Sequence, residues 1–159
     1  MRAKKSLALN EVTVAFEGLN ITGYFSDKGL VRLEIANKTA KKKGDAKLQK
    51  QLSAALQAAV KGKKFDLKFD LSGLTEFQLK TLGVMQKIPA GATKSYKDLA
   101  VAVKNPRAAR AIGNVCNKNP IPILIPCHRV IHSNGGITGY ALGVSMKKKL
   151  LNLEQKNAA

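Results

Sequence analysis

The chain has few acidic residues, cysteines and histidines, and it lacks tryptophan. Its 159 residues include 10 aspartates and glutamates against 28 lysines and arginines, a formal charge of +18, with two cysteines and two histidines. Two cysteines cannot build a disulfide framework, and together with the histidines they lack the paired spacing of a structural zinc site. We therefore expect reduced thiols and no bound metal.

Long apolar segments are absent as well. No apolar run reaches the roughly 20 residues that a membrane-spanning helix needs, and Met1–Asn10 has basic residues without an apolar segment before a cleavage site. Apolar residues nevertheless make up 45% of the chain, enough for the core of one large domain or two small ones. The sequence predicts a cytoplasmic protein that does not associate with membranes.

The positive charge favours a polyanionic partner, because lysines and arginines that neutralise phosphates release condensed counterions. Solubility alone is the alternative interpretation. Residues 1–75 hold 15 basic and 7 acidic residues, and residues 76–159 hold 13 and 3. The three late acids are Glu76, Asp98 and Glu154. We interpret Asp98 as an exposed helix charge.

Alternating apolar and polar residues predict strands in the first half of the chain. The alternation occurs at residues 12–16, 30–35 and 65–71. Apolar residues four positions apart between Asp45 and Val60 predict an amphipathic helix. This half is predicted to form a small sheet covered by a helix.

Helix signals dominate from Thr75 onward. Thr75 can cap a helix that ends at residues 88–91, Ser95 can cap a short one, and residues 107–118 predict another after a turn. Two short helices joined by a turn are typical of a helix-turn-helix, although any packed pair of short helices has the same pattern.

The expected fold class is therefore α/β (α+β) in two parts. Residues 1–74 form a small N-terminal sheet-and-helix module, and residues 75–159 form a mostly helical C-terminal domain with a helix-turn-helix.

Cys127 and His128 follow a proline-rich apolar stretch, Asn119–Pro126. Its prolines exclude a helix and predict an extended, rigid segment that presents the two side chains together. A thiol reacts as its thiolate, and basic neighbours such as His128 and Arg129 lower a cysteine pKa. A buried cysteine beside a surface histidine is the alternative, and local chemistry alone does not decide between them.

Several motifs occur here in a characteristic order. They are IPAG at 88–91, SYKDLA at 95–100, RAARAIG at 107–113, NP at 119–120, PCHRV at 126–130, glycines at 135, 136, 139 and 143, and a last helix at 147–154. Over residues 75–154 the chain resembles the alkylguanine-DNA alkyltransferases. These repair proteins move an alkyl group from damaged DNA onto their own cysteine.

The resemblance implies catalytic roles. Cys127 is the nucleophile, His128 is the base that acts on it through a water, and Glu154 orients His128. Tyr96 crowds the neighbouring phosphate and gives a proton to the departing guanine. No cofactor or metal is implied, and each chain reacts once because the product thioether is not hydrolysed.

The partner that the resemblance implies is double-stranded DNA with an alkylated guanine, bound through its minor groove after the target base is flipped out. Arg110 is the finger that fills the gap in the base stack, and Asn119 is the hinge between the recognition helix and the active-site strand. Further DNA-binding residues are Arg107, Ala108, Ala109, Ala111 and Gly113. Small residues on a helix are equally suited to plain packing.

The substrate pocket is expected around the loop at residues 133–143. The residues implied to form it are Val130, Ser133, Tyr140, Ala141 and Leu142. The main-chain carbonyls at Cys127 and Val130 accept the exocyclic amine of guanine. Leu142 is bulkier than the glycine of some relatives, so we expect a pocket suited to methyl and other small alkyl groups.

The predicted activity is single-turnover DNA repair by a monomer, with transfer of the alkyl group from O6-methylguanine, and from O4-methylthymine, to Cys127. A lesion sensor that flips damaged bases without reacting is the alternative, but relatives of that kind replace the cysteine. An ordinary cysteine hydrolase would need an oxyanion site, of which the sequence shows no sign. Residues 1–72 contain no cysteine or histidine, so a zinc site built from those ligands is excluded there.

Overall fold

A computed structural model of the chain describes residues 8–36, 43–137, 140 and 142–158. Three strands come first, β1 (Asn10–Phe16), β2 (Leu19–Ser26) and β3 (Gly29–Ala36), and they form an antiparallel sheet in that order. The turn between β1 and β2 has positive φ at both Glu17 and Gly18, the geometry of a type I′ turn that suits the twist of a hairpin.

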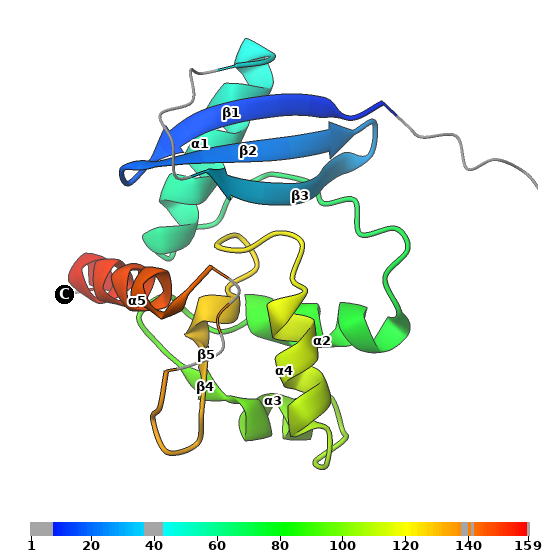
Figure 1. The fold of residues 1–159 in the computed structure, drawn as a ribbon, viewed down its shortest axis with the longest axis vertical. Helices are drawn as coiled ribbons and strands as arrows, with labels where there is room; N and C mark the ends of the chain where they lie inside the picture. The colour runs from blue at the N-terminus through cyan, green and yellow to red at the C-terminus, as the bar shows by residue number, and fades with distance from the viewer. Residues whose placement is uncertain (1–7, 37–42, 138–139, 141, 159) are drawn as a thin grey trace, which may run out of the picture.

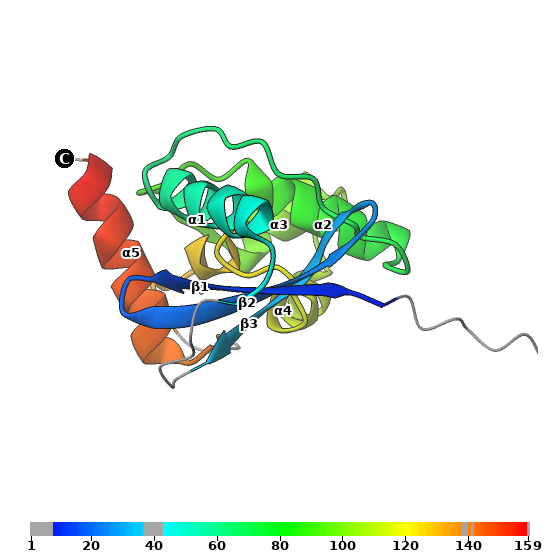
Figure 2. The same cartoon turned by 90° about the horizontal axis from the view of Figure 1, so that it is seen from above.

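Helix α1 (Ala46–Val60) covers one face of this sheet (Figures 1 and 2). Asp45 caps the helix by accepting a hydrogen bond from the backbone of Leu48 at 3.0 Å. The predicted helix is thus confirmed. Gly23 on β2 allows the close approach of α1, since a Cβ atom there would lie 3.0 Å from the side chain of Leu52.

The predicted strand at residues 65–71 is wrong. Among the described residues its backbone pairs with the sheet at one bridge, between Leu30 and Phe69, through two hydrogen bonds, Leu30 N to Lys68 O (2.9 Å) and Asp70 N to Leu30 O (2.8 Å). The side chain of Ser26 on β2 also donates to Asp70. Apolar and polar residues alternate here because the segment runs along the protein surface with one side facing inward. An extended segment that pairs with no strand has the same pattern.

The remaining elements follow residue 75. They are α2 (Glu76–Gln86), β4 (Lys94–Ser95), α3 (Tyr96–Ala102), α4 (Ala109–Asn117), the 3-10 turn η1 (Cys127–Arg129), β5 (Val130–Ile131) and α5 (Val144–Ala158). Helices α3 and α4 lie at the end of the molecule away from the sheet, while α5 lies beside α1 (Figure 1). The expected α/β architecture, a small antiparallel sheet plus helices, is confirmed.

Capping boxes begin two of these helices. Thr75 pairs with Gln78 at the start of α2, and Ser95 pairs with Asp98 at the start of α3. Asp98 is therefore not merely an exposed helix charge, because its carboxylate accepts a hydrogen bond from the backbone N–H of Ser95 at 2.9 Å. Helix α4 begins at Ala109, so Arg107 lies in the turn before it.

The segment between α4 and Cys127 is not extended as predicted. It folds back on itself through a turn at Ile123 and Leu124, with a bridge between Pro122 and Ile125, and Ile123 has a φ of 74°. The prolines do exclude a helix there, but they also remove backbone donors that an extended ladder would use. The turn is buried, and it delivers Cys127 on the short η1 helix.

A two-stranded parallel pairing joins the helix pair to η1. Lys94 on β4 pairs with Val130, and Ser95 pairs with Ile131. This pairing places the start of α3 next to the segment that carries Cys127.

In the part of the chain that the structure describes, no helix has the length and apolar character to cross a membrane.

Candidate active site

Cys127 opens η1 in a buried position, with 2% of its surface exposed. Burial raises the pKa of its thiol above the usual 9.0, while polar contact with Asn119 and the positive charge of Lys147 act in the opposite direction. The expected lowering by the adjacent basic residues is therefore wrong. The neighbouring Arg129 is turned away from the thiol and is engaged by a carboxylate.

His128, the residue after Cys127 in η1, forms a buried hydrogen bond with Glu154. Nε2 of His128 lies 2.7 Å from Oε1 of Glu154, and both residues are 0% exposed. Burial lowers the pKa of His128 below 6.5, and this effect exceeds the opposing effect of Glu154, so the imidazole is neutral at pH 7. Its other nitrogen, Nδ1, has no hydrogen-bond partner among the described residues and can accept a proton.

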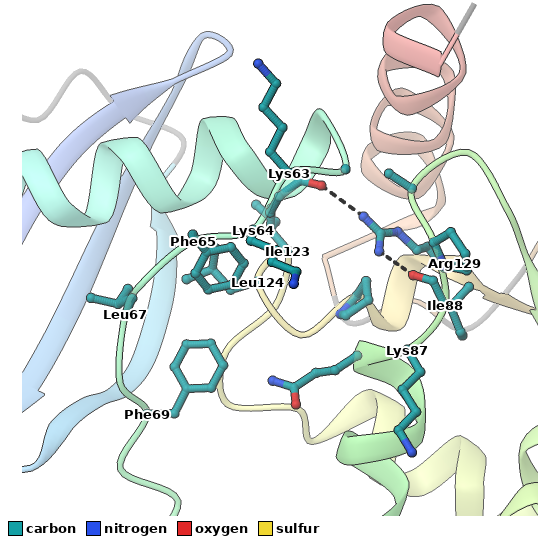
Figure 3. A pocket seen from close by; sticks show the side chains of 16 residues that line it. Lys63, Lys64, Phe65, Leu67, Phe69, Lys87, Ile88, Ile123, Leu124 and Arg129 are labelled. Atoms are coloured by element: carbon teal, nitrogen blue, oxygen red, sulfur yellow. Dashed lines mark hydrogen bonds between the residues drawn. The ribbon is translucent and has the colours of Figure 1, made fainter.

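Arg129 holds the carboxylate of Glu154 from the other side. Its guanidinium donates to both carboxylate oxygens at 2.7–3.1 Å and to the carbonyl of Ala59 at 3.1 Å. It also donates to the carbonyl of Ile88 at 2.6 Å (Figure 3). Burial acts to raise the pKa of Glu154, but the hydrogen bonds from His128 and Arg129 outweigh it and the net pKa is lowered. Glu154 is therefore a carboxylate beside a neutral imidazole.

Lys147 is a second buried cation near the thiol. It is 1% exposed, its Nζ atom donates to the carbonyl of Val130 at 2.6 Å, and it lies 5.9 and 5.8 Å from the ring centres of Tyr96 and Tyr140. Burial lowers its pKa, and the nearby thiols oppose that shift. Sequence reasoning gave Lys147 no role, although its spacing of seven residues from Glu154 would have placed both on one face of a helix.

Asn119 ties the end of α4 to the segment before Cys127. Its Nδ2 atom donates to the carbonyl of Ile125 at 2.8 Å, and its Oδ1 atom accepts from the backbone of Ile121 at 3.0 Å. The side chain thus closes the buried turn at both ends. This geometry is that of a hinge or clamp between the two elements.

The helix pair presents most, but not all, of the predicted DNA-binding residues to solvent. Arg107, Arg110 and Ala111 are exposed, and Ala109 and Gly113 are partly exposed. Ala108 is only 8% exposed, because it packs inward at the start of α4. It supports the turn and does not present its methyl group to a ligand.

Tyr96 lies between α4 and the loop that follows β5. It begins α3 directly after β4, and His132 follows β5, so the parallel pairing brings their rings within 5.2 Å of each other. Burial raises the pKa of Tyr96 to about 12, and therefore its hydroxyl stays protonated at neutral pH. Gly113 lies against the same ring.

The residues predicted to form the substrate pocket differ in how deeply they are buried. Val130 and Tyr140 are buried, Leu142 is partly buried, and Ser133 is exposed. Burial raises the pKa of Tyr140, whose ring lies near Cys127 and Lys147. Ala141 falls outside the described residues.

Together these observations put a buried thiol and a neutral, carboxylate-bound imidazole on consecutive residues of η1. Such a set can deprotonate the thiol at the moment of reaction and can stabilise the positive imidazolium that results. Two exposed arginines on a helix-turn-helix lie on the same C-terminal part of the chain. The arrangement suits transfer of a group from DNA to sulfur.

Comparison with known proteins agrees with this chemistry. Residues 76–156 match the family model described as the DNA binding domain of 6-O-methylguanine DNA methyltransferase. The methylated-DNA–protein-cysteine methyltransferase of Methanosarcina barkeri is 44% identical over 132 residues, which are 82% of this chain and 81% of the relative. The inducible enzyme of that name from Bacillus subtilis is 45% identical over 96 residues, which are 60% of this chain and 53% of the relative.

Solved structures extend the similarity to nearly the whole chain. The O6-methylguanine methyltransferase of Mycobacterium tuberculosis has a TM-score of 0.80 at 32% identity and covers 95% of each chain. The same organism's protein in complex with DNA has a TM-score of 0.79 at 34% identity, covering 91% of this chain and 92% of the other. The chain therefore belongs to the methylated-DNA–protein-cysteine methyltransferase family, enzymes that bind DNA and repair it by transferring an alkyl group to one of their own cysteines.

Proposed function

We propose that Cys127 is the alkyl acceptor and that it takes the methyl group from O6-methylguanine in duplex DNA. The observation that carries the proposal is the buried contact of His128 with Glu154 at 2.7 Å, made by the residue that follows the buried Cys127 in η1. No other cysteine has such neighbours, since the remaining thiol, Cys116, contacts the sulfur of Met85 at 3.8 Å.

The reaction is one displacement at carbon. The thiol proton passes, through a water, to Nδ1 of His128, and Glu154 stabilises the imidazolium. The sulfur then forms a bond to the methyl carbon as the bond between that carbon and O6 breaks, and the electron pair leaves with guanine. Tyr96, which burial keeps protonated at neutral pH, gives a proton to the departing base, and the proton held by the imidazolium then returns through water to Tyr96, so the thiol proton is in effect transferred to guanine. The thioether is stable, so each chain reacts once.

DNA is bound, in this proposal, through the minor groove with α4 against it. The target base must leave the stack, because its O6 group cannot reach a buried thiol from within a duplex. Arg110, exposed on the first turn of α4, would fill the gap, and the partly exposed Ala109 and Gly113 would allow close approach of the sugars.

The flipped base would lie between Tyr96, Tyr140 and the main chain at Cys127 and Val130. Lys147 occupies one lone pair of the Val130 carbonyl, which leaves a second for the exocyclic amine of guanine. O4-methylthymine is a second proposed substrate, because its alkyl oxygen is chemically equivalent. Leu142, partly buried at the pocket loop, favours small alkyl groups.

We further propose that the protein works as a monomer in the cytoplasm, where thiols stay reduced. Residues 1–74 would form one module and residues 75–159 the reactive domain. Arg129 would couple the two, since it bonds the carbonyl of Ala59 in α1 as well as Glu154.

Mass spectrometry of the protein after incubation with a methylated duplex tests the acceptor. We expect the peptide with Cys127 to gain the mass of one methyl group in place of a proton, the peptide with Cys116 to stay unchanged, and Cys127→Ser to gain nothing. An unmodified Cys127 with the lesion still in the DNA would contradict the proposal and would favour the non-reactive lesion sensor.

Base flipping has its own test in Arg110→Ala. We expect this variant to react normally with the free base O6-methylguanine but roughly a hundredfold more slowly with a duplex, a loss typical of misplacement at a reacting centre. Lys118→Ala is the matched control, since it removes another exposed charge close to α4. Equal losses on free base and duplex would contradict the finger role.

A further inference from the structure

A pocket of about 560 Å³ lies beside the Arg129 end of η1. It opens between the C-terminal end of α1, the segment 62–69 and the C-terminal end of α2 (Figure 3). Cys127, His128 and the residues of α4 do not line it. The reacting groups proposed above are therefore not exposed in this cavity, although Arg129, which holds Glu154, forms part of its wall.

The rim of the pocket is positively charged and uncompensated. Lys63, Lys64 and Lys87 line it and are exposed, and Figure 3 shows the side chains of Lys63 and Lys87 extending outward in opposite directions. None of the three forms an ion pair with a described residue. No aspartate or glutamate is among the described residues that line the pocket. An anion entering the pocket would therefore meet only positive charge.

Two carbonyls at the negative end of α1, which would repel an anion, are engaged in hydrogen bonds. The carbonyl of Ala59 accepts from Arg129 at 3.1 Å, and the carbonyl of Val60 accepts from Asn157 at 3.0 Å. The charge of Arg129 itself is matched by Glu154. The three lysines thus determine the electrostatic character of the opening.

The wall of the pocket is aromatic and apolar. The rings of Phe65 and Phe69 lie with their centres 6.2 Å apart and are only partly buried, and Ile123 and Leu124 lie behind them (Figure 3). Phosphate groups alone would not need such a wall. A ligand that fits both features carries anionic groups and flat rings together.

Unpaired nucleotides have this combination, whereas the bases of a duplex are stacked and inaccessible to a phenylalanine ring. We propose that this lysine–phenylalanine pocket binds a single-stranded segment of DNA, with bases against Phe65 and Phe69 and phosphates at Lys63, Lys64 and Lys87. This site is separate from the duplex-binding face at α4 and does not depend on it. It also gives a purpose to part of the positive surplus of residues 1–75, which the alkyl transfer leaves unexplained.

Photo-crosslinking locates the strand directly. An oligothymidylate of about eight nucleotides, within the usual range of single-strand sites, carries one 5-iododeoxyuridine and is irradiated with the full-length protein. We expect the crosslink in the peptide that contains Phe65 and Phe69. Crosslinks confined to α3 and α4 would overturn the proposal.

Fluorescence anisotropy with the same oligonucleotide measures how much the three lysines contribute to the salt dependence of binding. We expect the triple variant Lys63→Glu, Lys64→Glu, Lys87→Glu to reduce the dependence of log affinity on log salt by about 2, the value for three single-strand phosphate contacts. The control is Lys28→Glu, Lys47→Glu, Lys50→Glu, which makes the same change of charge at exposed positions outside the pocket. Equal effects of the two triples would overturn the proposal.

Two further measurements distinguish a single-strand site from a general anion site and from a mononucleotide site. Phe65→Leu keeps an apolar side chain but removes the ring, and we expect it to weaken oligothymidylate binding about tenfold without weakening duplex binding. Free thymidine monophosphate at equal nucleotide concentration should not displace the strand. An equal loss of duplex affinity in Phe65→Leu, or full displacement by the free nucleotide, would contradict a single-strand site.

Discussion

The Oε1 atom of Glu154 lies within 2.7 Å of both Nε2 of His128 and Nη2 of Arg129, so one buried carboxylate bonds two consecutive residues of η1. Because Arg129 supplies a permanent positive charge, the carboxylate keeps its own charge, and His128 can remain neutral. A neutral imidazole is the form that can accept the thiol proton. Burial is therefore the main reason that the base stays neutral, and the charge of Arg129 acts in the same direction.

The first prediction concerns Glu154→Gln. This substitution leaves Arg129 buried without its counter-charge, which typically costs about 3–5 kcal/mol of unfolding free energy, and it replaces the charged acceptor of His128 with a neutral amide oxygen that stabilises the imidazolium less. We expect alkyl transfer to slow by about a hundredfold. Urea unfolding and single-turnover kinetics measure the two effects.

Glu76→Gln is the matched control, because Glu76 is exposed and its pairing with Lys80 is a surface contact worth under about 1 kcal/mol. A Glu154→Gln protein as stable and as fast as Glu76→Gln would show that the buried carboxylate has neither role.

The second prediction concerns pH. The pKa of His128 lies below 6.5 because the ring is buried, so the neutral base persists as the pH falls through 6.5. The rate of reaction with the free base O6-methylguanine should stay level to that point and decline only at more acidic pH. An acid limb centred above pH 6.5 would contradict a lowered pKa.

The unfolding free energy should also depend on pH through His128. Because the pKa of His128 is lower in the folded protein than in the unfolded chain, the unfolded chain binds more protons between the folded pKa and 6.5. The unfolding free energy should therefore fall as the pH drops through this window. In His128→Gln that part of the pH dependence should disappear.

Much of the fold could be predicted from local patterns, because capping and turn signals act within a few residues. Thr75 and Ser95 cap the helices that their positions predicted, and Asp45 caps the helix that apolar spacing predicted. The segment 65–71 misled the prediction, since alternation reports which side chains face inward and not whether the backbone finds a partner strand. The single bridge at Phe69 shows the difference.

The active site was predictable only in part, since its charges come from distant places in the chain. The family motif indicated Cys127, His128 and Glu154, and the structure brings the last two into contact. The orientation of Arg129 away from the thiol depends on carbonyl groups of Ile88 and Ala59, 41 and 70 residues away. No pattern around residue 129 could have shown that.

The third prediction tests the clamp at Asn119. Asn119→Ala removes the partners of two part-buried backbone groups, at Ile121 and Ile125, and we expect a loss of about 2 kcal/mol in unfolding free energy. Asn134→Ala is the control, because Asn134 makes the same kind of turn contact with Gly136 at an exposed position. Equal losses in urea unfolding would show that Asn119 is an ordinary turn residue.

The fourth prediction concerns Lys147→Met, which removes the buried positive charge near the thiol while keeping an unbranched side chain. Because that charge opposes the raising of the Cys127 pKa by burial, its loss should raise the pKa further. Alkylation of Cys127 by iodoacetamide without DNA should become roughly tenfold slower at a fixed pH, as expected for one charge at short range. The substitution removes the cost of burying a charge, and this gain offsets the cost of leaving the Val130 carbonyl without its partner. The unfolding free energy should therefore change by less than about 2 kcal/mol.

Lys148→Met removes an exposed charge from the next position and should leave the iodoacetamide rate unchanged. If both variants slow the reaction alike, the net charge of α5 and not the buried ammonium group acts on Cys127.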